Sequence, residues 1–244
     1  VLMRPRQYKA GGGMALLSLV LRQHDAGYSM NFAAARYNMV ESQLRTNRVT
    51  DEEVLAAFQS VPREQFVPTA LRGIAYVDED LEIAPGRWLM EPMVLARLVQ
   101  AAEVRPEDVA LVVGCGTGYS CAILARLAST VVAVESDHEL ATRAQQILNE
   151  LSVDNVVFAE GRLTDGNPRQ APYDVILLDG GVEEVPESTK RQLPEGGRLV
   201  TVMRQGRVGR AVLMINRGGV VSSRVLFDAA VPVLPGFARE PGFV

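Results

Sequence analysis

The chain is organised around Val109-Ala110-Leu111-Val112-Val113-Gly114-Cys115-Gly116-Thr117-Gly118, an apolar run that passes directly into a glycine-rich loop. Residues 120–127 then have a helical pattern, and a second apolar run at 131–134 ends in Glu135. Two further runs follow at 156–158 and 175–178, the latter ending in Asp179. Short runs that are apolar on both faces are typical of strands in a buried parallel sheet. Their alternation with helices predicts an α/β fold with a doubly wound, Rossmann-like sheet.

Three regions are expected along the chain. Residues 30–104 form an N-terminal helical cap with a substrate loop, and residues 105–244 form the Rossmann-like core, with C-terminal strands near 199–203, 211–215 and 220–226. Residues 1–29 form a poorly ordered or peripherally packed leader. Its order of basic and then apolar residues resembles a secretory signal, but no small-residue cleavage site follows the apolar run.

Two helices of the cap can be described in more detail. In the first, Phe32, Tyr37, Val40 and Leu44 are expected to share the inward face. The second is predicted to begin at Thr50, which forms a capping box with the glutamate three residues later. A third amphipathic helix is expected at 93–102.

The composition excludes several classes of protein. The chain has 244 residues, 48% of them hydrophobic, and a formal net charge of −4, so it can bury a full core and gives no global electrostatic support for nucleic-acid binding. Two cysteines, Cys115 and Cys121, and two histidines, His24 and His138, cannot form a four-ligand zinc site at the usual spacings or a disulfide framework. We therefore expect no metal, and a reduced, cytoplasmic location. No segment approaches the roughly 18 apolar residues that span a bilayer.

The glycine loop and the following acid predict a nucleoside site. Glycines allow a ligand to approach the backbone closely, and Glu135 at the tip of the next strand can accept hydrogen bonds from both ribose hydroxyls. A dinucleotide fingerprint would have glycine or alanine where this chain has Tyr119. The loop also lacks the Gly-Lys-Ser/Thr of a nucleotide-triphosphate site. S-adenosyl-L-methionine is therefore the expected cofactor, with NAD as the alternative.

Motifs across most of the chain resemble one family. In chain order they are Val61-Pro62-Arg63-Glu64-Gln65-Phe66-Val67-Pro68, Ala75-Tyr76, Gly86, Glu91-Pro92, the glycine loop with Tyr119, Pro172-Tyr173-Asp174, Gln192-Leu193 and Gly196-Gly197-Arg198-Leu199-Val200. Together they resemble the protein-L-isoaspartate O-methyltransferase family, from about Asn38 to Leu234. The resemblance implies a class I methyltransferase sheet, S-adenosylmethionine as methyl donor, and transfer of the methyl group to an isoaspartyl carboxylate in damaged proteins.

The chain departs from the family at functional positions. The family's acid two residues before the first glycine is Val112 here, and the acid of a Gly-Asp-Gly element near the adenine is replaced by Arg162 after Gly161. Glu160 or Asp179 are possible substitutes. Where the family has Gly-Gln-Thr-Ile-Ser, with hydroxyls that contact the substrate, this chain has Arg87, Trp88 and Met90 at the Gln, Thr and Ser positions.

The predicted site residues follow from the motifs and the resemblance. For the acceptor they are Arg87, Trp88 and Met90, where Arg87 either pairs with a carboxylate or faces water and Trp88 either lines the pocket or packs in the core. For the cofactor they are Gly114, Cys115, Gly116, Gly118, Tyr119, Glu135, Ser136, Gly161, Arg162 and Asp179.

Two other classes of function compete with an active protein carboxyl methyltransferase. One is a catalytically silent S-adenosylmethionine-binding or partner-binding module, favoured by the altered substrate loop. The other is an NAD-linked oxidoreductase, which Tyr119 and the lack of a proton relay oppose. The scarcity of histidine and lysine does not oppose methyl transfer, because a carboxylate acceptor is already ionised at neutral pH and needs no general base.

The last third of the chain carries a strip of basic residues. Its members are Lys190, Arg191, Arg198, Arg204, Arg207, Arg210, Arg217 and Arg224. Because no aromatic residues are interleaved to stack on bases, a solvated or peptide-steering face is expected rather than nucleic-acid binding. The oligomeric state is not predicted.

Overall fold

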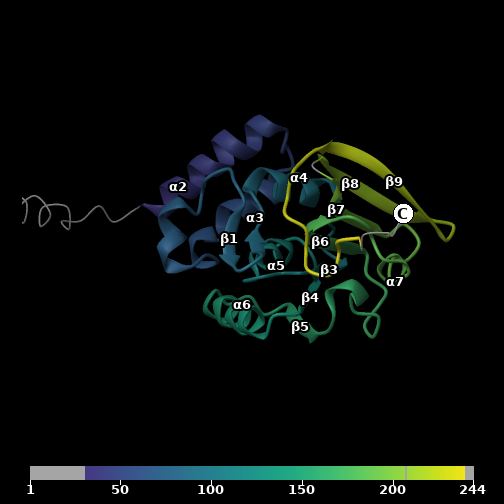
Figure 1. Ribbon diagram of the computed structural model, residues 1–244. Helices are drawn as coiled ribbons and strands as arrows, with labels where there is room; N and C mark the ends of the chain where they lie inside the picture. Colours follow the sequence, from purple (N-terminus) through teal and green to yellow (C-terminus); the bar gives the residue numbers. More distant parts are fainter. Residues whose placement is uncertain (1–30, 207, 240–244) are drawn as a thin grey trace, which may run out of the picture. The chain divides into compact units, whose positions relative to one another are not determined.

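The computed structural model describes residues 31–206 and 208–239, and the chain divides into two units, 1–31 and 32–244. The predictions for the leader and for Arg207 lie outside the described residues. The second unit is an α/β domain (Figure 1). Its helices are α2 (Phe32–Met39), α3 (Glu52–Ser60), α4 (Pro92–Ala101), α5 (Tyr119–Leu124), α6 (His138–Glu150) and α7 (Glu187–Lys190). Shorter helical turns are η1 (Val40–Leu44), η2 (Arg45–Asn47), η3 (Arg63–Gln65), η4 (Thr69–Ile74) and η5 (Leu163–Asp165).

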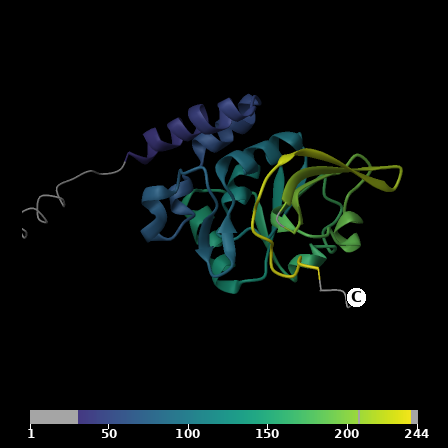
Figure 2. The same cartoon turned by 45° about the horizontal axis from the view of Figure 1, so that its top comes forward.

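A seven-stranded sheet with the order β5-β4-β3-β6-β7-β8-β9 forms the centre of the domain. Its strands are β3 (Val109–Val113), β4 (Thr130–Glu135), β5 (Val156–Glu160), β6 (Val175–Val182), β7 (Arg198–Gln205), β8 (Val208–Arg217) and β9 (Val220–Asp228). The pairs from β5 to β7 are parallel, whereas β8 is antiparallel to both of its neighbours. The β8–β9 ribbon projects from the edge of the sheet (Figure 2). The predicted doubly wound fold is confirmed.

Alternate residues of each central strand face two separate cores, which explains why the runs are continuously apolar. In β3, Ala110 and Val112 belong to the core that contains α3, α4, α5 and α6, and α4 lies against β7 and β8 (Figure 1). Leu111 and Val113 belong to the core on the opposite face, together with Leu193, Leu234 and Phe237 from the segments that cover it. Both faces of the sheet are thus covered.

The strand order changes direction at β3. From β3 the chain adds β4 and β5 on one side and then crosses to β6 on the other side. In open α/β sheets, ligands bind outside the carboxyl ends of the strands at such a switch point. The ends of β3, β4 and β6 therefore position the candidate site.

Two details of the N-terminal helices differ from the sequence predictions. Asp51, not Thr50, caps α3, because its side chain accepts hydrogen bonds from the backbone N–H of Glu53 and Val54. Tyr37 is 56% exposed, and Met39 is buried instead. Tyr37 follows Phe32 by five residues in the regular helix α2, and at 3.6 residues per turn this separation places the two side chains on different faces. The π-helical turn η1 begins only at Val40.

A two-stranded hairpin that sequence patterns missed precedes α4. Its strands are β1 (Leu81–Ala84) and β2 (Arg87–Leu89), and they pair only with each other among the described strands. Gly86 occupies the turn with φ +70°. Buried and exposed residues alternate in both strands, which is the sequence signal of a strand. With four and three residues, however, the strands are too short for this alternation to be recognised.

Candidate nucleoside and acceptor site

The glycine loop connects β3 to α5 through three residues with positive φ. The φ angles are +78° at Gly114, +55° at Gly116 and +92° at Gly118. A Cβ atom added at Gly118 would lie 3.1 Å from Cβ of Ala144 in α6, so the third glycine allows α5 and α6 to pack closely. These residues therefore meet the backbone requirements of a nucleoside-binding loop.

Glu135, at the end of β4, lies beside this loop. Its Oε2 accepts a hydrogen bond from the backbone N–H of Gly116 at 2.8 Å, and its Oε1 accepts from the N–H of Ser136 at 2.7 Å. Both oxygens also accept from the Arg87 guanidinium at 2.5 Å. The predicted ribose carboxylate thus forms a bidentate ion pair with the hairpin. Neither sequence interpretation of Arg87, a contact with the acceptor or exposure to water, describes this pairing.

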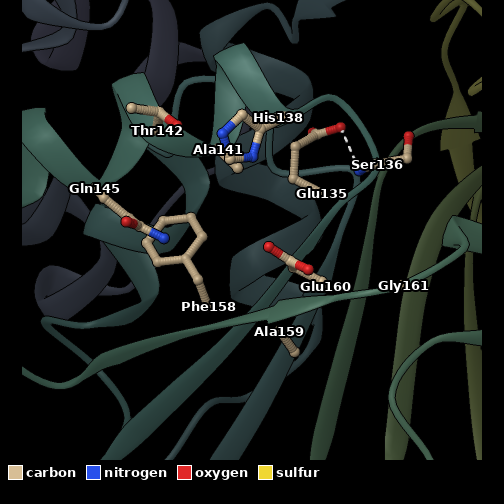
Figure 3. A pocket seen from close by; sticks show the side chains of 10 residues that line it. All are labelled: Glu135, Ser136, His138, Ala141, Thr142, Gln145, Phe158, Ala159, Glu160 and Gly161. Atoms are coloured by element: carbon tan, nitrogen blue, oxygen red, sulfur yellow. Dashed lines mark hydrogen bonds between the residues drawn. The ribbon is translucent and has the colours of Figure 1, made fainter.

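A pocket of about 400 Å³ lies next to Glu135 (Figure 3). It is lined by Glu135, Ser136, His138, Ala141, Thr142, Gln145, Phe158, Ala159, Glu160 and Gly161. In Figure 3 the side chains of Phe158 and Glu160 face the α6 residues across the pocket. An aromatic wall with a few polar groups suits a planar heterocycle. Ser136 and Gly161, which were predicted to bind the cofactor, line this pocket, whereas Arg162 is exposed and does not line it.

Asp179 is a second buried acid of the site, besides Glu135. It lies where the register between β6 and β7 shifts, an irregularity of the kind that re-aims a side chain. Oδ2 accepts a hydrogen bond from the Ser120 hydroxyl at 2.5 Å, but Oδ1 is buried with no hydrogen-bond partner among the described residues. Burial raises the pKa of Asp179 to about 6, while the Ser120 hydrogen bond and the charges of Arg87 and Arg63 lower it. An unpartnered buried carboxylate oxygen is a candidate for a cationic ligand group.

Arg63 is a buried cation of the same region that the sequence did not single out by itself. Its Nε donates to the carbonyl of Ala75 at 2.7 Å and its Nη2 to the carbonyl of Met90 at 2.8 Å. The guanidinium carbon lies 4.9 Å from the centre of the Tyr119 ring. Nη1 of Arg63 and the Tyr119 hydroxyl are both buried without partners within the part of the chain that the structure describes. Burial lowers the pKa of Arg63 and raises that of Tyr119 to about 12.

Trp88 and Met90, the other two predicted acceptor residues, lie in different environments. Trp88 is 37% exposed on β2, so the interpretation as a core residue is wrong. Met90 is buried, and its carbonyl accepts from Arg63. Glu91, the next residue, has its pKa raised to about 7 by burial and by the charges of Asp80 and Asp78.

The cysteines have no features of a reactive site. Both are free and buried. The hydrogen bond with Cys121 and burial raise the pKa of Cys115, which opposes thiolate formation. No cluster of three or more His, Cys, Asp or Glu residues suited to a metal occurs in the segments 31–206 and 208–239.

The basic strip is not uniformly solvated. Arg198 is partly buried, its Nε donates to the carbonyl of Ala102 at 2.8 Å, and its Nη2 pairs with Oδ2 of Asp108. Arg204 donates to the carbonyl of Val231. Arg210 matches the expected exposed position, with Asp228 at 3.9 Å. Arg198 therefore has a structural contact, in contrast to the prediction for the strip.

A doubly wound sheet with a glycine loop, a ribose-type carboxylate and no dinucleotide fingerprint is the arrangement expected of a class I methyltransferase. The family model of protein-L-isoaspartate(D-aspartate) O-methyltransferase matches residues 35–229. The chain belongs to this family. The expected enzyme class and the S-adenosylmethionine cofactor are thereby confirmed, and the NAD-linked alternative is disfavoured.

Individual relatives agree with this assignment. A protein-L-isoaspartate O-methyltransferase of Methanoculleus marisnigri is 37% identical over 206 residues, which cover 84% of this chain and 94% of the relative. A solved structure of a protein-L-isoaspartate O-methyltransferase has a TM-score of 0.72 at 26% identity, covering 82% of this chain and 66% of the other. A Plasmodium falciparum structure described as this enzyme with S-adenosyl-L-homocysteine has a TM-score of 0.71 at 20% identity, with coverage of 82% and 97%, and supports the fold.

Among the described helices, none combines the length and apolar character required to cross a bilayer.

Proposed function

We propose that the protein transfers a methyl group from S-adenosylmethionine to the carboxylate of an isoaspartyl residue, or of a related acceptor, in damaged proteins. The observation that carries this proposal is the placement of Gly116 after β3, Glu135 at the end of β4 and Asp179 on the neighbouring strand β6, in a chain of this family. We also propose a cytoplasmic location, which the two free cysteines favour.

The residues present fit the cofactor. The pocket beside Phe158 suits the adenine, and Glu135 suits the ribose once its oxygens are available. Asp179 suits the ammonium group because Oδ1 has no partner in the described part of the chain. This acid replaces the missing one at Val112, which is buried among apolar residues in β3. Glu160 instead lines the pocket beside Phe158, so we assign the substitution to Asp179.

The protein's own contribution to methyl transfer is orientation and exclusion of water. When bound, S-adenosylmethionine supplies an electrophilic methyl group on a sulfonium. An acceptor carboxylate with an ordinary pKa near 4 is already ionised, so no side chain has to remove a proton. Holding the acceptor oxygen in line with the methyl group and excluding water account for the rate enhancement. The buried Arg63, with its unpartnered Nη1, adds a positive charge to the region.

The alternative is a silent S-adenosylmethionine-binding or partner-binding module. Its support is specific, because Trp88 and Met90 replace the two hydroxyl residues of the family's substrate loop. Loss of such polar groups weakens recognition of a polar acceptor.

One pair of measurements separates these functions. Calorimetric titration with S-adenosylhomocysteine tests cofactor binding, and methanol release from an isoaspartyl peptide, compared with the same peptide containing normal aspartate, tests methyl transfer. We expect binding together with turnover of the isoaspartyl peptide alone. Binding without turnover would favour the silent module, and absence of binding would contradict both functions.

A further inference from the structure

Both oxygens of the Glu135 carboxylate already accept hydrogen bonds from within the protein, which leaves no position for the ribose hydroxyls. Oε1 accepts from Nη1 of Arg87 at 2.5 Å and from the backbone N–H groups of Ser136 and Asp137 at 2.7 and 3.0 Å. Oε2 accepts from Nη2 of Arg87 at 2.5 Å and from the N–H of Gly116 at 2.8 Å. The Glu135 side chain is 0% exposed. Ribose hydroxyls can reach this carboxylate only after one of these donors leaves.

Arg87 is the donor that can leave. The three backbone N–H groups belong to the glycine loop and to the turn that follows β4, both of which are fixed by the central sheet. Arg87 instead belongs to the β1–β2 hairpin, whose strands pair only with each other in the described sheets. Within residues 31–206 and 208–239, no backbone hydrogen bond joins the hairpin to the central sheet, so its movement would leave the ladder of that sheet intact, whereas Leu81, Ile83 and Leu89 pack it against the core.

A second residue of the hairpin covers the glycine loop itself. A Cβ atom added at Gly116 would lie 2.7 Å from Cδ1 of Ile83 in β1. Ile83 and Arg87 are both buried. The same hairpin therefore covers two parts of the proposed site, the loop backbone through Ile83 and the ribose carboxylate through Arg87.

We propose that Arg87 competes with the nucleoside for Glu135 and so couples occupancy of the cofactor site to the position of hairpin 81–89. Without nucleoside, the ion pair holds the hairpin over the loop. With nucleoside bound, the ribose takes the oxygens of Glu135, and the guanidinium leaves together with β2. Once it has left Glu135, the Arg87 guanidinium needs water or another anion as its partner, because an unpaired buried charge is strongly destabilising. Arg87 is a positioning residue in this proposal, which rests on the proposed function.

The decisive experiment replaces Arg87 with glutamine, the residue that the family has at this position. Calorimetry with S-adenosylhomocysteine should give a dissociation constant about tenfold lower for Arg87→Gln than for the unmodified chain, because the competing state is removed. Arg87→Lys, which keeps the charge but loses the bidentate geometry, should lie between the two. Arg45→Gln is the matched control, since it removes an exposed arginine that pairs with Glu52.

Hydrogen exchange of the unmodified chain provides a measurement that needs no variant. The backbone N–H groups of residues 81–89 should exchange faster when S-adenosylhomocysteine is bound, and Arg87→Gln should show this faster exchange without ligand. An unchanged or weaker affinity in a folded Arg87→Gln variant, or exchange in the hairpin that does not respond to the ligand, would overturn the competition alone. Failure of both proteins to bind S-adenosylhomocysteine would overturn the proposed function and the competition with it.

Discussion

The Ser120 hydroxyl donates a 2.5 Å hydrogen bond to Oδ2 of Asp179, and Oδ1 of the same carboxylate is buried without a partner in the described residues. A hydrogen bond from α5 thus fixes the orientation of an acid on β6 while one of its oxygens stays available. The family's usual acid position, Val112, lies on the neighbouring strand β3. In the function that we propose, the acid that holds the cofactor's ammonium group therefore lies one strand away from the family's usual position.

Replacing Asp179 with asparagine is expected to weaken S-adenosylhomocysteine binding about tenfold or more, because a charge-assisted hydrogen bond to the ammonium contributes roughly 1.5 to 3 kcal/mol. Calorimetry measures the change. Binding of 5′-methylthioadenosine, which lacks the amino and carboxyl groups, should remain the same. Asp228→Asn, at an exposed acid, serves as the control. Equal loss of affinity for both ligands would assign Asp179 a structural role instead.

Cofactor affinity is also expected to depend on pH through Asp179. Since burial raises its pKa to about 6, the fraction of ionised carboxylate increases as the pH rises through that value, and S-adenosylhomocysteine should bind more tightly at pH 7 than at pH 5. The stability of the protein without cofactor should change with pH in the opposite direction. An unfolded aspartate titrates near 4, so the free energy of unfolding falls as the pH rises from about 4 to about 6. Titrations across this range should show both trends, and Asp179→Asn should reduce both.

The central sheet could be predicted because its signal is local. Residues 109–113 and 175–178 are apolar without interruption, and both faces of β3 and β6 are buried. The glycine loop and Glu135 followed from the same pattern, since a parallel strand places its last residues at the ligand edge of the sheet. Local sequence therefore identified the strands and the nucleoside side of the site.

The contacts of the substrate loop could not be predicted in the same way. Arg87 and Glu135 are separated by 48 residues, and nothing in the neighbourhood of either one identifies the other as its partner. The position of Tyr37 was wrong for a local reason, because Tyr37 follows Phe32 by five residues in α2, a separation that does not keep two side chains on one face of a helix. Non-local pairing depends on tertiary packing, which short sequence patterns do not contain.

Replacing Arg198 with glutamine is expected to lower the free energy of unfolding by about 2 to 4 kcal/mol, because Asp108 would remain buried without its cation. Two backbone carbonyls, of Ala102 and Glu103, would also lose a donor. Arg210→Gln is the matched control, since that arginine is 57% exposed and its change should stay within about 0.5 kcal/mol. Urea unfolding measures both. Equally small losses of stability in both variants would show that Arg198 makes no stabilising contact and belongs to the solvated face of the strip.

Restoring the family's hydroxyl at position 88 tests the acceptor site directly. Trp88→Thr should raise kcat/KM for an isoaspartyl peptide about fivefold, since one added hydrogen bond to the acceptor is worth roughly 1 kcal/mol. Trp88→Val is the matched control, because valine has the shape of threonine without the hydroxyl. The exposure of Trp88 should keep both variants stable. Position 90 is less suited to this test. Met90 is buried, so Met90→Ser would leave a cavity and lower the free energy of unfolding by about 2 to 4 kcal/mol. Equal activity of Trp88→Thr and Trp88→Val in the methanol-release assay would show that a hydroxyl at position 88 forms no hydrogen bond with the acceptor.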